Sequence, residues 1–221
     1  MTMWDKILGA AADIMKRIAG ADGAATEKVT FTIGVIALSA KMAKADGTVT
    51  QDEIGAFREI FEIPPQERKN VARVYDLAKQ DTAGFESYAR QVAKLFNDRR
   101  VVLEDLLGAL FHIARADGVV DETEMDYLRR VAGIFGFDDL EFECIAARQV
   151  GEGKADPYTV LGLDRGADDA TVKTAWRRLA KEHHPDRLIA LGMPREFIKV
   201  AEDRLAAVNA AYERIAASRG L

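Results

Sequence analysis

The chain has 221 residues, of which 48% are hydrophobic and 30% charged, so its length and composition allow one or two packed domains. Its formal net charge of −5 argues against nucleic-acid binding, because proteins that bind nucleic acids usually carry a marked basic excess. The single cysteine, Cys144, excludes an internal disulfide and a zinc site built on cysteine pairs, and it suits a reducing compartment such as the cytoplasm.

Residues 1–22 form the first predicted unit, an amphipathic helix over 3–18 followed by a glycine-bearing link. Apolar residues recur there at helical spacing, and the charged residues lie on the opposite face. We expect the apolar face to dock on the rest of the chain or on a second copy, which would make a homodimer. The alternative is a helix lying on the inner membrane, where Trp4 would suit the interface. Docking is favoured, because acidic residues offset the few basic ones on the polar face.

Residues 23–149 form the second predicted unit, which shows helical periodicity from Glu27 to about Gln149 and contains an internal repeat. The stretch 43–54 (Ala-Lys-Ala-Asp-Gly-Thr-Val-Thr-Gln-Asp-Glu-Ile) returns at 114–125 as Ala-Arg-Ala-Asp-Gly-Val-Val-Asp-Glu-Thr-Glu-Met. Each copy lies between two apolar helices, and two related helical halves predict a compact all-α bundle. The helices are expected near residues 31–43, 54–61, 65–79, 85–97, 101–114, 125–135 and 139–149.

The two Asp-Gly motifs permit two interpretations, helix capping and metal binding. In the first, Gly47 and Gly118 each end a helix in the left-handed conformation, and a capping box starts the next helix. A calcium loop is disfavoured, because its first and third ligand positions would hold apolar or basic residues in both copies. Capping is therefore the favoured role, and no cofactor is expected. The alternative is a divalent ion shared by both turns, for which the candidate ligands are Asp46, Glu53, Asp117 and Glu124.

The C-terminal unit is predicted at residues 156–221, after a short glycine-bearing linker at 150–155. A basic helix runs into the tripeptide His184-Pro185-Asp186, and the proline should end that helix because it lacks a backbone donor and disfavours a helical residue before it. A second helix near the C-terminus carries a matching apolar stripe. The two stripes should pack as an antiparallel helical hairpin with the tripeptide at its tip.

The helix before the tripeptide also carries four basic side chains, called here the basic row. Their spacing places them on neighbouring faces of the helix: Lys173, Arg177, Arg178 and Lys181. Charges on a helix usually serve only solvation, so the row alone predicts little. Beside a rigid exposed turn, however, it is typical of a docking surface, where charges steer the encounter and the turn makes the specific contact.

Both units resemble known families. The Ala-Asp-Gly repeats of residues 23–149 resemble the TerB domain associated with tellurite resistance. The C-terminal unit resembles the J domain of DnaJ-type co-chaperones, and the combination looks like the DjlA subfamily. The resemblance implies an all-α fold, a TerB-like helical bundle followed by a J-domain helical hairpin. Besides the basic helix and the tripeptide, the J-domain resemblance rests on Tyr158, Leu161, Gly162 and the stretch Asn209-Ala210-Ala211-Tyr212.

The resemblance also implies a function. In J domains the basic helix docks on an acidic surface of a DnaK-class chaperone ATPase, and the His-Pro-Asp tripeptide provokes ATP hydrolysis by that partner. The chain is therefore expected to be a co-chaperone, with the TerB-like domain recognising a client protein. It is not expected to be an enzyme, since no nucleophile with a base and no phosphate-binding loop accompanies the tripeptide. The alternative is a metal-responsive stress sensor of the tellurite type acting through the TerB-like domain.

Overall fold

A computed structural model describes residues 9, 34–42, 68–80, 84–96, 99–118, 120–149, 155–190 and 198–220. All regular secondary structure in these ranges is helical, which confirms the predicted all-α class. Within the same ranges no helix has the length and hydropathy needed to cross a membrane. The amphipathic helix expected over residues 3–18 and the linker expected at 150–155 fall almost wholly outside these ranges.

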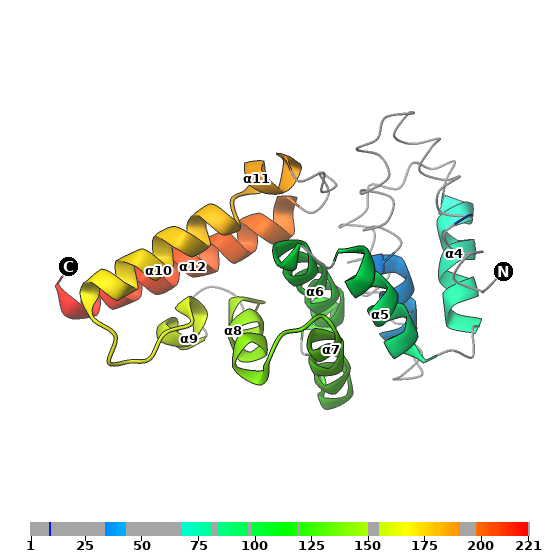
Figure 1. Cartoon of the computed structure of the whole chain (residues 1–221), viewed down its shortest axis with the longest axis horizontal. Coiled ribbons are helices and arrows are strands. Elements are labelled where there is room, and N and C mark those ends of the chain that lie inside the picture. Colours follow the sequence, from blue (N-terminus) through cyan, green and yellow to red (C-terminus); the bar gives the residue numbers. More distant parts are fainter. Residues whose placement is uncertain are drawn as a thin grey trace.

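The N-terminal bundle is built around one buried helix, α6 (Arg100–Ala114), which occupies its middle in Figure 1. Eleven of the fifteen residues of α6 are buried, because its sequence is apolar on nearly every side. Tyr127 links the neighbouring helix α7 (Glu122–Ile134) to the helical residues 34–42, because its hydroxyl donates a hydrogen bond to the carbonyl oxygen of Leu38 at 2.8 Å. The labelled helices of the bundle are α4 (Arg68–Gln80), α5 (Phe85–Leu95), α6 (Arg100–Ala114), α7 (Glu122–Ile134) and α8 (Asp139–Gln149).

The second Asp-Gly motif caps helices, as the sequence predicts. After α6 and a single 3-10 turn, Gly118 adopts φ 106°, in the left-handed region that favours glycine. Asp121 then caps α7: its carboxylate accepts from the Glu124 N–H at 2.8 Å, and the Glu124 carboxylate accepts from the Asp121 N–H at 3.0 Å. The first copy of the motif, at residues 43–54, lies outside the described residues.

The C-terminal unit is a hairpin of two long helices with a short helix packed against its side. Asp156 caps the short helix by accepting from the Thr159 N–H at 3.0 Å, and Gly162 ends it at φ 68°. The hairpin is closed by Trp176, whose indole stacks on Tyr212 at 4.3 Å between ring centroids and donates to Asn209 Oδ1 at 2.8 Å. The helices are α9 (Pro157–Leu161), α10 (Asp169–Glu182), α11 (Pro185–Ala190) and α12 (Ile198–Arg219).

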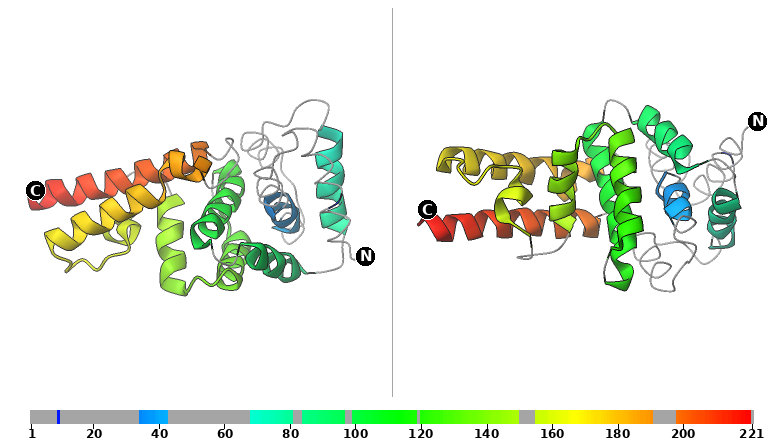
Figure 2. Two further views of the ribbon diagram at one scale, coloured as in Figure 1. Left: turned by 45° about the horizontal axis from the view of Figure 1, so that its top comes forward. Right: turned by 90° about the horizontal axis from the view of Figure 1, so that it is seen from below.

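The two units share an interface, formed by α8 and α6 on one side and by α9 and the start of α12 on the other. Figures 1 and 2 show α10 and α12 extending away from the bundle side by side, with the beginning of α12 against α6. The apolar stripe of the last helix is therefore divided. Val208 and Ile215 pack within the hairpin, whereas Val200 and Ala201, which the sequence pattern places on the same stripe, belong to the core of the bundle.

Candidate partner-binding site

The tripeptide lies in the break between α10 and α11. The N–H of His183 makes the last bond of α10, to the Leu179 carbonyl at 2.9 Å, and Pro185 begins α11, where a missing N–H costs nothing. His184 Nδ1 accepts from the backbone N–H of Asp186 at 3.2 Å, so the proton of the neutral imidazole is on Nε2. The helix break expected at this proline is present.

The tripeptide and the basic row are both open to solvent. The side chains of His184 and Asp186 are 54% and 87% exposed, and His184 Nδ1 lies 3.8 Å from an Asp186 carboxylate oxygen. All four members of the basic row are exposed on α10. Arg178 pairs with Glu182 at 2.9 Å, one turn further along, so part of the positive charge is offset at that point. The remaining three basic residues and the tripeptide form an accessible surface that runs along α10 to the helix break that follows it.

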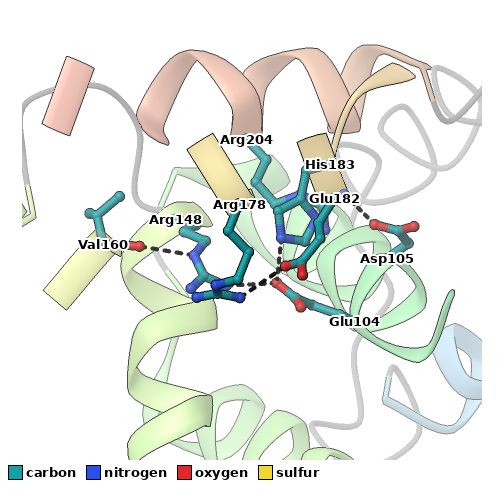
Figure 3. A network of polar contacts seen from close by, with 8 residues as sticks. All are labelled: Glu104, Asp105, Arg148, Val160, Arg178, Glu182, His183 and Arg204. Atoms are coloured by element: carbon teal, nitrogen blue, oxygen red, sulfur yellow. Dashed lines mark hydrogen bonds and ion pairs between the residues drawn. The ribbon is translucent and has the colours of Figure 1, made fainter. Parts of the chain in front are cut away.

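Next to the tripeptide in the chain, His183 belongs to a group of six polar side chains that we call the interdomain polar cluster, five of which appear in Figure 3. They come from four helices of both units, and each is at most 14% exposed. Among the described residues, six buried polar side-chain atoms lack a hydrogen bond, and all of them belong to this cluster. Its members are Glu104 and Asp105 of α6, Arg148 and Gln149 of α8, His183 at the end of α10, and Arg204 of α12.

Two acidic residues on α6 organise the cluster. Glu104 accepts from Arg148 at 2.7 Å and lies 3.4 Å from Nε2 of His183, the residue just before the tripeptide. Asp105 forms a buried ion pair with Arg204 of α12. Arg148 also donates through Nε to the Val160 carbonyl of α9 at 3.0 Å. The cluster therefore links the bundle to α9, to the end of α10 and to α12.

Burial shifts the pKa values inside the cluster. It raises the pKa of Asp105 from its ordinary 3.8 to about 6, although the charge and hydrogen bond of Arg204 lower it. Burial also lowers the pKa of His183 well below its ordinary 6.5, and the charges of nearby arginines, Arg204 first, act in the same direction. His183 is therefore neutral at pH 7.

Among the metal candidates, only Glu124 has a described side chain, and it takes part in the capping box of α7. Asp46 and Glu53 lie outside the described residues, and of Asp117 only the backbone is described. In the described parts of the chain, no three side chains of the types His, Cys, Asp or Glu are grouped so that they could hold a metal ion. The shared metal site stays a prediction.

Two known families match this chain, one over each structural unit. Residues 32–148 match the family described as Tellurite resistance protein TerB, and residues 156–218 match the DnaJ domain. The chain belongs to the TerB family. It carries the DnaJ domain at its C-terminal end, so the two resemblances seen in the sequence are confirmed.

Relatives that match most of the chain are named Co-chaperone protein DjlA. The one from Coxiella burnetii is 28% identical over 200 residues, which cover 81% of this chain and 74% of the relative. The one from Photobacterium profundum is 28% identical over 216 residues, covering 86% and 78%. The one from Pasteurella multocida is 26% identical over 235 residues, covering 88% and 82%. No solved structure gives a significant match.

Sequence reasoning missed the interdomain polar cluster. The only signal for it is the adjacent acidic pair Glu104 and Asp105 within the apolar run of α6, where two buried charges demand partners. The pattern of the sequence does not reveal that two of those partners, His183 and Arg204, come from the DnaJ domain, about a hundred residues away in the case of Arg204. His183, which precedes the tripeptide, likewise has no recognisable role until its burial is seen.

Proposed function

We propose that this chain is a co-chaperone whose DnaJ domain binds a DnaK-class chaperone ATPase and stimulates ATP hydrolysis by that partner. The chain itself catalyses no reaction in this proposal, and the TerB domain contacts the client protein. The observation that carries the proposal is the exposed His184-Pro185-Asp186 turn beside an exposed basic row. The names of the DjlA relatives support the same function.

The arrangement of the two domains is compatible with docking of such a partner. The TerB domain contacts α9, α12 and the buried His183, whereas the basic row of α10 remains in solvent. Exposed basic side chains accelerate encounter with an acidic surface, and a short rigid turn supplies the specific contact. Changes to the tripeptide should therefore abolish stimulation of the partner, whereas changes to the basic row should slow association with it.

The test is single-turnover ATP hydrolysis by a DnaK-class chaperone with the full chain added. His184→Gln or Asp186→Asn should abolish stimulation without unfolding the chain, because both side chains are exposed. A matched control is Asp139→Asn, which makes the same change at a side chain of α8 that is 89% exposed and remote from the turn. Equal stimulation by the wild type and His184→Gln would refute the proposal.

Charge reversal in the basic row completes this test. Arg177→Glu together with Lys181→Glu should raise the chain concentration needed for half-maximal stimulation and flatten its dependence on salt, because exposed charges act mainly on the association rate. The maximal stimulated rate should change little, since the tripeptide is intact.

A further inference from the structure

The interdomain polar cluster would be a costly way to do no more than hold the two domains together. Burying charged groups costs free energy, and apolar side chains of similar volume often hold such an interface at least as well. Hydrogen bonds and ion pairs are directional, however, so a polar interface can specify one orientation where an apolar interface permits several.

The contacts of the cluster converge on the two segments that hold the tripeptide. His183 precedes the tripeptide directly, is 1% exposed, and lies 3.4 Å from Glu104. The helix that begins at Pro185 of the tripeptide, α11, packs on α12, and α12 is held by the Arg204–Asp105 pair. Figure 3 shows that Glu104 approaches His183 and Asp105 approaches Arg204 of α12 from successive positions of α6.

Gly108 makes room for this arrangement one turn further along α6. A Cβ atom at Gly108 would lie 3.1 Å from Gln149 Nε2 and 3.8 Å from an Arg204 guanidinium nitrogen. The α6 backbone therefore approaches both side chains closely, and the cluster packs against a helix of the TerB domain rather than against a loop. Functional groups carried by rigid elements and supported from behind are held more accurately than groups on unsupported loops.

We propose that Glu104 and Asp105 of the TerB domain are positioning residues for the His184-Pro185-Asp186 tripeptide of the DnaJ domain. Glu104 acts through His183 and Arg148, and Asp105 acts through Arg204. The TerB domain thus fixes the orientation in which the tripeptide meets the partner ATPase. This inference rests on the proposed function, and it assigns to the TerB domain a role that does not depend on any client.

The first test measures the position of the tripeptide without any partner. The N–H groups of Asp186 and Arg187 donate to Nδ1 and to the carbonyl of His184 at 3.2 and 3.0 Å. In the full chain, Glu104→Gln should accelerate hydrogen exchange at these two amides by about three- to tenfold, while exchange at the Val172 amide near the start of α10 stays unchanged. The matched control is Glu143→Gln, which removes the same charge from an exposed pair with Arg129 on the TerB surface.

The second test measures stimulation of a DnaK-class ATPase over a range of chain concentrations. Glu104→Gln should lower the maximal stimulated rate by about three- to tenfold and leave the half-saturating concentration within about twofold, because the basic row is untouched. The double variant Asp105→Leu with Arg204→Met keeps the interface filled with apolar groups. It should keep or raise the midpoint of thermal unfolding and still lose maximal stimulation, which a merely structural role would not produce.

The outcomes separate this inference from the proposed function. Unchanged exchange at residues 186 and 187 in Glu104→Gln, or wild-type maximal stimulation by the folded Asp105→Leu and Arg204→Met double variant, overturns the positioning role. If the wild type itself fails to stimulate the ATPase, the proposed function is refuted, while altered exchange in Glu104→Gln still supports the positioning role. Wild-type behaviour of Glu143→Gln is expected in both tests, and the same effects in that control would also overturn the inference.

Discussion

His183 should make the stability of the folded chain depend on pH. Burial is the main cause of its lowered pKa, and Arg204, Arg148, Arg178 and Arg187, from α12, α8, α10 and α11, add to the effect. The acidic group nearest to His183 in the cluster is Glu104 of α6, and its carboxylate is already engaged by Arg148. The folded chain therefore holds this imidazole neutral well below pH 6.5.

The sign and size of the effect follow from proton linkage. In the unfolded chain His183 takes up a proton near its ordinary pKa of about 6.5, while in the folded chain it does not. The free energy of unfolding must then fall as the pH falls through that value. Between about pH 7.5 and about pH 5.5 one such group costs about 1.4 kcal/mol of stability. Asp105 contributes with the opposite sign, because its folded pKa of about 6 lies above its ordinary 3.8.

The assay is urea unfolding of the wild type and of His183→Gln at both pH values. Glutamine fills a similar space and does not titrate, while Asp105 contributes to both proteins and cancels in the comparison. The wild type should lose about 1.4 kcal/mol more than the variant between the two pH values. An equal pH dependence of the two proteins would show that His183 titrates normally in the folded chain, and the argument from burial would then be wrong.

Two further predictions concern helix ends. Asp121→Ala removes the acceptor for the Glu124 N–H in the capping box of α7. It should lower the free energy of unfolding, measured by urea titration, by about 1 kcal/mol. An unchanged unfolding midpoint would contradict the capping role. Gly162→Ala places a side chain in the left-handed region at φ 68° and should lower the free energy of unfolding by about 1–2 kcal/mol. Gly166→Ala, at a position in open space without a positive φ, should not lower it. Equal unfolding midpoints for the two variants would contradict the argument from backbone strain.

The local features of this protein were readable from its sequence because they depend on neighbouring residues. The helix break at Pro185, the cap at Asp156 and the capping box at Asp121 each follow from backbone chemistry within four positions. The chemistry of the tripeptide region was likewise recognisable, because its pattern is short and continuous in the chain.

The packing of one domain on the other was not readable in this way. Helical periodicity shows that Val200 and Ala201 lie on an apolar face, but it does not show which surface covers them. The same limit applies to Asp105 and Arg204, whose pairing joins positions 99 residues apart. Such contacts depend on how two folded units fit together, and a residue pattern in one unit carries little information about the other.

The divided stripe of α12 makes one helix a structural part of both domains. Its first residues, Val200 and Ala201, belong to the core of the TerB domain, while Val208 and Ile215 belong to the core of the DnaJ hairpin. Unfolding of the TerB domain would expose the start of a helix on which the hairpin depends. The stabilities of the two domains should therefore be coupled.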